Sequence, residues 1–331
     1  MFVLVITELV DQRNGTLTRA YTEGTKNNIK GHWESYVDFC QKYQRDELNA
    51  TVESLSLYVQ YLSNRLESPG AVKNYLAGVK TMFVINNWGT EIFDDYLIKM
   101  MLRGIDVVKQ HVPRKALPIT PLLLMSIGEI WDDSVDNNST YWALFLIAFY
   151  LLARKSNLVP DSVTKFNPLK QLTRGDLEVT DKALMVTLKW SKTNQAGRRE
   201  IFPLPRNRGS PLCPVRAYRK MVRLFPAEGA SPAFLVGRYG RVQTVTYRMF
   251  QERIKKAVTE IGLEPQGYSS HSFRRGGATY AFHSGVHPNL IKKLGDWRSD
   301  AYLEYIDFPV EDRLKAGKQI KKMINKELAR R

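Results

Sequence analysis

The residues best suited to chemistry in this 331-residue chain lie between His271 and Tyr305. His271 and Arg274 are three residues apart, so on a helix both side chains point to the same face. Trp297 and Tyr305 follow, after glycines that break or end helices. An imidazole, a guanidinium, an indole N–H and a phenol in this order suit an anionic centre that passes through a pentacoordinate state. A DNA phosphodiester attacked by a tyrosine is such a centre.

A second guanidinium comes from Arg154. It follows the apolar run 141–153, where a charge is costly unless a partner neutralises it. A guanidinium donates in a fork that matches phosphate oxygens, and two of them stabilise the charge that develops during the reaction. A structural ion pair is the alternative explanation for either arginine. Arg275 points about 100° away from Arg274 on a helix, toward DNA backbone or an acidic neighbour.

These residues resemble the tyrosine recombinase (phage integrase) family. The family pattern is an upstream Arg, a Lys on a β-hairpin, His-x-x-Arg, then His or Trp, and finally the nucleophilic Tyr. The segment Trp-Arg-Ser-Asp-Ala-x-x-x-Tyr looks most similar to recombinases of eukaryotic mobile elements, the DIRS and Crypton types. The resemblance implies a site-specific DNA recombinase or integrase that works through a covalent 3′-phosphotyrosine, with no metal, ATP or other cofactor.

The resemblance also assigns the nucleophile and the general acid. Tyr305 is the nucleophile by family spacing, and Tyr302, one turn earlier, is its rival. Lys192 lies in the polar turn between two predicted strands, where it would protonate the departing 5′ oxygen. Lys189 on the preceding strand is the fallback. A phenol has an ordinary pKa near 10, so nearby positive charge and a proton acceptor are needed at neutral pH.

Two further positions complete the predicted site. His271 would shuttle a proton or bind a phosphate oxygen, because imidazole titrates near neutrality. Trp297 stands where many members have a second His, so it would hold a phosphate oxygen or serve packing alone. One position departs from the family, since Asn157 occupies the place of an acidic residue three after Arg154. Asn can orient a neighbour but cannot neutralise Arg154.

Three other functions share parts of this pattern. A catalytically silent DNA-binding derivative would keep the fold and lose the chemistry, and the complete residue set speaks against it. A type IB topoisomerase-like enzyme or a telomere resolvase would use similar chemistry. The helical first domain and the Gly-Asp-Trp segment favour a recombinase.

The charge balance indicates a polyanionic partner. Lys and Arg number 49 against 33 Asp and Glu, which gives a formal net charge of +16 and favours double-stranded DNA. The resemblance implies a homo-oligomer, with a dimer on each site and a tetramer in the synapse. Candidate phosphate contacts, each also explicable as a solvated charge, are Lys73, Lys80, Lys109, Arg114, Lys115, Arg198, Arg199, Arg206, Arg208, Arg238, Arg241 and Arg275.

The sequence also predicts a cellular compartment. Two distant cysteines favour a reducing environment, and no metal-ligand spacing or signal peptide is found. The longest apolar run is too short to span a bilayer, so no membrane association is expected. We therefore expect a soluble, intracellular, DNA-associated protein, nuclear in a eukaryote or in the cytoplasm and nucleoid of a prokaryote.

The chain length predicts two domains, and the helical periodicity of most of its apolar residues predicts a mainly α fold. After a lead-in over 1–20, helical periodicity without strand patterns predicts a bundle over 21–112, which the resemblance identifies as a SAM-like core-binding domain. The proline-rich segment 113–120 predicts a linker to the catalytic domain, 121–331. That domain is expected to be rich in helix with one small three-stranded antiparallel sheet, with strands at 176–180, 182–190 and 200–204.

Apolar spacing predicts the individual helices of the first domain. Thr25 is expected to cap one of them, and Ser68-Pro69 reads as a cap followed by proline at the first helical position. The last helix of the bundle is expected to turn Ile98, Leu102, Ile105 and Val108 inward. At the other end of the chain, a basic helix over 310–331 carries apolar residues. In the family this segment docks on a neighbouring protomer, and packing within its own chain is the alternative.

Overall fold

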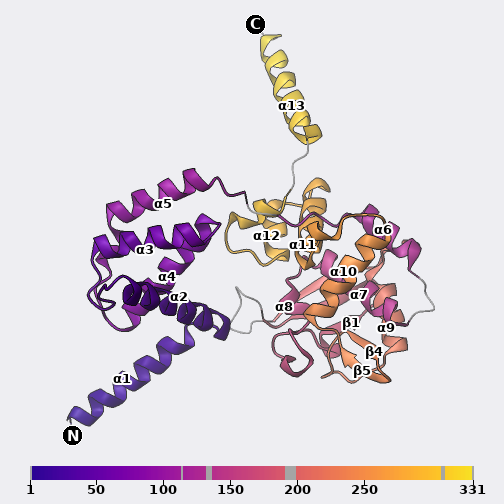
Figure 1. Ribbon diagram of the computed structural model, residues 1–331. Helices are drawn as coiled ribbons and strands as arrows, with labels where there is room; N and C mark the ends of the chain where they lie inside the picture. Colours follow the sequence, from indigo (N-terminus) through magenta and orange to yellow (C-terminus); the bar gives the residue numbers. More distant parts are fainter. Residues whose placement is uncertain (1, 113–114, 132–135, 191–198, 307–309, 330–331) are drawn as a thin grey trace. The chain divides into compact units, whose positions relative to one another are not determined.

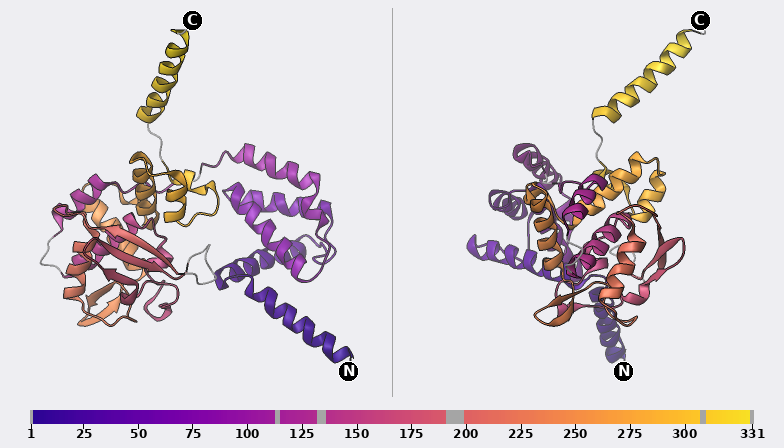
Figure 2. Two further views of the ribbon diagram at one scale, coloured as in Figure 1. Left: turned by 180° about the vertical axis from the view of Figure 1, so that it is seen from behind. Right: turned by 90° about the vertical axis from the view of Figure 1, so that its right-hand side faces the viewer.

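The computed structural model describes residues 2–112, 115–131, 136–190, 199–306 and 310–329. The chain divides into two compact units, Met1–Arg114 and Lys115–Arg331 (Figure 1 and Figure 2). The boundary falls inside the proline-rich segment. Residues 115–120 of that segment belong to the second unit, where the Leu117 N–H donates to the Gly267 carbonyl and the Ile119 N–H to that of Ser272.

The described part of the first unit is built of helices. α2 packs on α4 and α3 on α5, and the rings of Tyr36, Tyr58 and Phe83 meet in the core. Each of α2 to α5 turns one apolar stripe inward, as expected for helices that share a core. The elements are α1 (Phe2–Arg19), α2 (Glu23–Lys42), α3 (Val52–Arg65), α4 (Pro69–Ile85), η1 (Glu91–Asp94) and α5 (Tyr96–Lys109).

Helix starts in this unit are fixed by capping side chains. The Ser68 hydroxyl caps α4 and Pro69 is its first residue, as predicted. α2 is capped by Thr22 rather than by Thr25, whose N–H donates to the Thr22 hydroxyl. The prediction for Val108 was also wrong: its side chain is 82% exposed, because the buried stripe of α5 ends at Ile105.

No helix was predicted in the lead-in over 1–20, and the structure contains the helix α1 there. Its apolar residues Leu9, Val10 and Leu17 remain exposed. Because periodicity in a sequence reports a buried stripe, a helix without one gives little signal.

α7 is the central helix of the second unit, and it was predicted as a buried helix. Its side chains from Ala143 to Phe149 are buried, and the ring of Phe145 packs against Phe250 of α10 and Phe273 of α11. A helix covered on all sides must be apolar all round. The helical elements up to α10 are α6 (Pro121–Ile130), α7 (Asp136–Tyr150), α8 (Lys155–Leu158), η2 (Val163–Lys165), η3 (Arg174–Asp176), α9 (Pro214–Leu224) and α10 (Tyr247–Glu260).

The predicted sheet is present. β1 (Leu177–Val179), β2 (Ala183–Leu188) and β3 (Glu200–Pro205) form an antiparallel sheet in the order β1-β2-β3. A second hairpin, β4 (Leu235–Arg238) with β5 (Arg241–Thr244), was not predicted. Its two-residue turn has positive φ angles at both positions, 51° at Tyr239 and 71° at Gly240, which is the geometry that suits the twist of a hairpin.

The C-terminal part of the second unit carries the predicted chemistry. Gly285 follows α11 with a φ of 78°, and Gly295 caps α12. Tyr305 is the last residue of η5, a 3₁₀ helix. The remaining elements are η4 (Pro265–Gly267), α11 (Ser270–His283), α12 (Pro288–Leu294), η5 (Asp300–Tyr305) and α13 (Val310–Leu328). Among the described residues, no helix is both long and apolar enough to cross a membrane.

Candidate active site

The Arg274 guanidinium is the centre of the site. Its side chain is 2% exposed, and its Nη1 and Nη2 donate to the carbonyls of Leu152 and Gly295 at 2.5 and 2.6 Å. The guanidinium carbon lies 3.7 Å from the centre of the Trp297 ring. Its Nε is buried and has no hydrogen-bond acceptor among the residues that the structure describes. A buried donor of this kind is costly unless a ligand supplies the acceptor.

The Arg274 guanidinium remains protonated although it is buried. Desolvation, and then the positive charge of Arg154, lower the pKa of Arg274 to about 9, while Tyr305 and Asp296 act in the opposite direction. A group with this pKa is still protonated at neutral pH. Arg274 can therefore stabilise negative charge on a bound phosphate.

Two glycines let α11 approach the core closely enough to place Arg274. A Cβ on Gly277 would lie 2.3 Å from the Phe149 carbonyl oxygen, and one on Gly276 would lie 1.7 Å from that of Ile119. These positions must lack a side chain, because backbone oxygens cannot yield that space.

Arg154 is the N-cap residue of α8, directly after the buried helix α7. Its Nη1 lies 2.7 Å from Asp296 Oδ2, and its Nη2 donates to the Asp296 carbonyl at 3.0 Å. The two arginines therefore meet on the turn that holds Gly295 and Asp296. Sequence reasoning placed both arginines at one phosphate and missed Asp296 as the partner of Arg154.

Tyr305 lies against the cationic and aromatic groups of the site. Its ring centre is 5.3 Å from that of Trp297 and 6.5 Å from that of His271, and the Arg274 guanidinium is 5.4 Å away. The Arg274 and Tyr305 side chains are also within hydrogen-bonding reach of each other. Tyr302 is buried in an apolar cluster that also contains Trp297, with the two ring centres 6.3 Å apart, and Tyr305 packs against the same cluster.

Two contacts from α11 hold the backbone around Tyr305. The Thr279 hydroxyl donates to the Tyr305 carbonyl at 2.9 Å, and Arg275 Nη1 donates to the Glu304 carbonyl at 3.1 Å. Arg275 is buried, and its charge helps to lower the pKa of the Glu304 carboxyl, after Lys115. The printed side-chain bond of Arg275 thus goes to a backbone carbonyl beside Tyr305, and its contact with DNA stays a prediction.

His271 is in the first turn of α11, where the Ser269 hydroxyl caps the helix. The residue is partly exposed to solvent. Partial desolvation, and then neighbouring positive charges led by Arg274, lower the pKa of His271 from its usual 6.5. The imidazole is therefore neutral at pH 7 and able to accept a proton.

Lys192 lies outside the described residues, as do Arg198 and Arg114. The strand that leads to Lys192 is fixed by two contacts. Lys189 forms a largely buried ion pair with Asp176 at 2.5 Å, and Asn157 Nδ2 donates to the Trp190 carbonyl at 2.6 Å. The fallback Lys189 thus has an acidic partner of its own. The Asn157 side chain therefore stabilises this segment, and the Arg154 side chain is contacted by Asp296 instead.

Several candidate DNA contacts are paired within the chain. Lys73 binds Asp106 at 2.7 Å and Lys80 binds Asp94 at 2.5 Å in the first unit, and Lys115 binds Glu304 at 2.6 Å in the second. These lysines are partly exposed, and such pairs exchange readily with solvent or phosphate.

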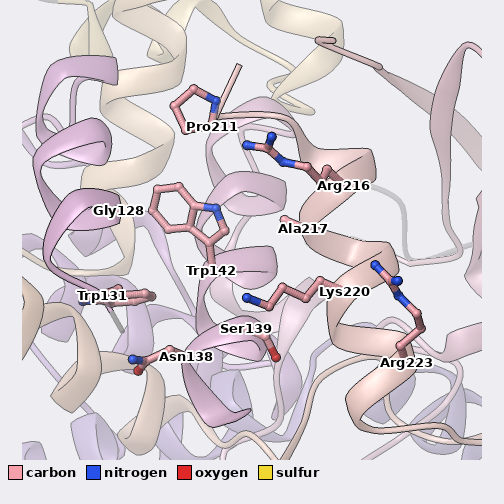
Figure 3. Close-up of a pocket in the computed structure, with 10 residues that line it drawn as sticks. All are labelled: Gly128, Trp131, Asn138, Ser139, Trp142, Pro211, Arg216, Ala217, Lys220 and Arg223. Atoms are coloured by element: carbon pink, nitrogen blue, oxygen red, sulfur yellow. The ribbon is translucent and has the colours of Figure 1, made fainter. Parts of the chain in front are cut away.

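No cluster of three or more potential metal ligands occurs among the described residues. A cavity of about 430 Å³ lies between α6, α7 and α9, as Figure 3 shows. It is lined by Trp131, Trp142, Arg216, Lys220 and Arg223 among others. None of the site residues above borders it, so this cavity is separate from the candidate active site.

The fold of the chain is that of the tyrosine recombinases. It aligns with the XerH site-specific recombinase bound to a palindromic difH substrate, at 14% identity and a TM-score of 0.59, over 87% of this chain and 76% of that one. It aligns with a lambda integrase dimer bound to a COC′ core site, at 14% identity and a TM-score of 0.53, over 93% of this chain and 95% of that one.

Among curated proteins, the "Integrase/recombinase xerD homolog" of Selenomonas ruminantium is 23% identical over 283 residues, which are 83% of this chain and 79% of the relative. No family model matches the chain. The chain is therefore similar to tyrosine recombinases in fold, and to one curated integrase/recombinase in sequence.

Proposed function

We propose that this protein is a site-specific recombinase or integrase that cleaves and rejoins DNA strands through Tyr305. The phenolic oxygen attacks the phosphorus of a phosphodiester, the bond to the 5′ oxygen breaks, and a 3′-phosphotyrosine forms. The 5′ hydroxyl of another strand then attacks this bond and releases Tyr305. Each step exchanges one phosphate ester for another, so neither ATP nor a metal ion is needed.

The observation that carries this proposal is the set of groups gathered around one phenol. Arg274 and Arg154 offer guanidinium donors to the non-bridging oxygens, and the unpartnered Nε of Arg274 marks a place for one of them. Neutral His271 can accept the phenolic proton, and the Trp297 indole can donate to the phosphate or pack the tyrosine. Donors already held in place stabilise developing charge without reorganisation.

The general acid is proposed to be Lys192, on the loop between β2 and β3. A substrate with sulfur in place of the 5′ bridging oxygen has a leaving group that needs no protonation. Lys192→Ala should therefore cleave the normal substrate slowly and the sulfur substrate at nearly the normal rate. Lys189→Ala is the matched variant. If Lys189→Ala rather than Lys192→Ala shows this selective rescue, the acid is Lys189.

The test of the main proposal uses a pool of randomised DNA duplexes, each with a nick that lets the released fragment diffuse away. We expect a covalent protein–DNA adduct that survives denaturation and maps to Tyr305. Tyr305→Phe should bind the same DNA without an adduct, and Tyr302→Phe should retain the adduct. Binding without any adduct by the unaltered protein would identify a silent derivative. Relaxation of supercoiled DNA that lacks partner sites would identify a topoisomerase-like enzyme.

The solved relatives support a proposal about partners and domains. XerH and lambda integrase were captured on DNA, the latter as a dimer. We propose that residues 21–112 and 121–331 of this chain hold double-stranded DNA as core-binding and catalytic domains, joined by 113–120. A dimer on each site and a tetramer in the synapse complete the assembly, inside the cell where the DNA lies. The similarity to DIRS and Crypton recombinases remains a prediction.

The C-terminal helix is proposed to dock on a neighbouring protomer. α13 has no buried residue, and Leu314, Ile320 and Met323 are among its exposed apolar side chains. A cavity of about 920 Å³ borders α6, α11 and the first turn of this chain's own α13, with Leu122, Met125 and Arg313 among its lining residues. We assign this groove as the receiving surface for α13 of a second copy.

This docking proposal can be tested by deleting residues 311–331. The deletion should leave binding to a single site intact and abolish the assembly of two sites. Unchanged assembly would mean that α13 packs within its own chain.

A further inference from the structure

We propose that Asp296 is the residue that positions Arg154 for phosphate binding, in place of the acidic residue that this chain lacks at Asn157. This inference rests on the proposed function, because it assigns a role within the same site. Asp296 is a positioning residue in this proposal, since it acts through Arg154.

The contacts between Asp296 and Arg154 hold the guanidinium at two points. Nη1 lies 2.7 Å from the Asp296 carboxylate, and Nη2 donates to the Asp296 carbonyl at 3.0 Å. Only 18% of the Arg154 side chain and 27% of the Asp296 side chain are exposed, so solvent screens this pair less than a surface pair. A guanidinium has five N–H donors. These two contacts leave three donors for phosphate oxygens.

One short turn serves both arginines of the site. The Gly295 carbonyl accepts from Arg274 Nη2 at 2.6 Å, and the next residue supplies both acceptors for Arg154. The turn is itself fixed, because the Trp297 N–H bonds to the Lys292 carbonyl. Its conformation therefore sets the spacing of the two guanidinium groups that would grip the phosphate.

The Asp296 carboxylate also offsets the positive charge of Arg154 and Arg274. Arg154 and Arg274 are close enough that the charge of Arg154 lowers the pKa of Arg274, while the charge of Asp296 raises it. Asn157 is neutral, so it cannot offset the positive charge of the two arginines, and its side chain already donates to the Trp190 carbonyl. Asn157 thus stabilises the segment that contains Trp190, and Asp296 contacts Arg154.

The backbone at Asp296 determines which variants test the idea cleanly. Its φ is 53°, in the left-handed region that Asn and Gly tolerate and most other residues avoid. Asp296→Asn removes the charge and keeps an acceptor, while Asp296→Gly removes the whole side chain without backbone strain. Asp300→Asn is the matched control, because it removes one negative charge nearby, from an exposed pair with Lys292.

The first readout separates DNA binding from cleavage. Asp296→Asn and Asp300→Asn should bind DNA as tightly as the unaltered protein or slightly more tightly, since both remove a negative charge. Asp296→Asn should form the covalent adduct on the order of 10²-fold more slowly, because misplacement of a reacting group by about 1 Å has this effect. Asp296→Gly should be at least as slow, and Asp300→Asn should be normal. Normal adduct formation by Asp296→Asn overturns the proposal.

The second readout does not depend on DNA cleavage. In ¹⁵N NMR of guanidinium groups, the Arg154 Nη signals, assigned from their loss in Arg154→Lys, should be resolved in the unaltered protein and averaged in Asp296→Gly. If they are equally ordered in both proteins, Asp296 does not position Arg154. If the unaltered protein forms no adduct, the proposed function fails, and the NMR comparison still decides the role of Asp296.

Discussion

Gly276→Ala is predicted to damage both the stability and the chemistry of the second unit. An added Cβ would lie 1.7 Å from the carbonyl oxygen of Ile119 and 2.7 Å from its carbonyl carbon. Because backbone atoms cannot rotate away, α11 and residue 119 must separate by more than about 1 Å. That movement breaks the hydrogen bond from the Ile119 N–H to the Ser272 carbonyl, which is 3.0 Å long.

The size of the effect follows from two contributions. Overpacking of a close contact costs about 1–3 kcal/mol, and a buried N–H left without an acceptor costs about 1–3 kcal/mol. We therefore expect a loss of about 4 kcal/mol in the free energy of unfolding, or roughly 8–16 °C in Tm for a unit of this size. Because Arg274 lies on the displaced helix, adduct formation should fall roughly 10²-fold.

Calorimetry on the full chain, together with the adduct assay, checks this prediction. The matched control is Gly31→Ala in the exposed interior of α2, where an added Cβ meets nothing within 4 Å. That substitution should stabilise its own unit by roughly 0.5–1 kcal/mol, since Ala favours helix over Gly. If Gly276→Ala unfolds at the normal temperature and cleaves at the normal rate, the close approach of α11 to residue 119 is wrong.

The remaining predictions concern the site and the assembly. Arg274→Lys should slow single-turnover adduct formation by roughly 10²–10³-fold, because an ammonium cannot reproduce the guanidinium fork; a rate close to normal would remove Arg274 from the chemistry. His271→Gln should remove a pH dependence of stability. The pKa of His271 is lowered in the folded protein, so the unaltered protein should lose stability relative to His271→Gln as the pH falls from 6.5 through that lowered pKa. Urea denaturation at each pH measures this difference, and an equal change of unfolding free energy with pH in both proteins would contradict the assignment. Leu122→Glu in the groove should abolish the assembly of two sites and spare binding to one, whereas assembly at the normal level would move the receiving surface elsewhere.

Much of the fold could be predicted because the information is local. The stripe of Val72, Leu76, Val79 and Phe83 repeats at helical spacing, and all four side chains are buried in α4. The alternation of Leu184 and Val186 predicted β2 in the same way. α1 and the β4–β5 hairpin were missed. In α1, Leu9, Val10 and Leu17 stay exposed, and in the hairpin the burial of neighbouring residues does not alternate along either strand.

By itself, the sequence determined which chemical groups this protein carries, in which order, and on which local elements. The tertiary structure alone decided which of them meet. Arg154 and Asp296 are 142 residues apart, and no periodicity links them, because their contact depends on the path of the chain. Burial likewise distinguishes Tyr302, which is buried in the apolar cluster, from Tyr305, which is only partly buried there and lies beside Arg274. Local spacing reports the face of a helix, whereas the partner of a charged group is fixed only when distant segments pack together.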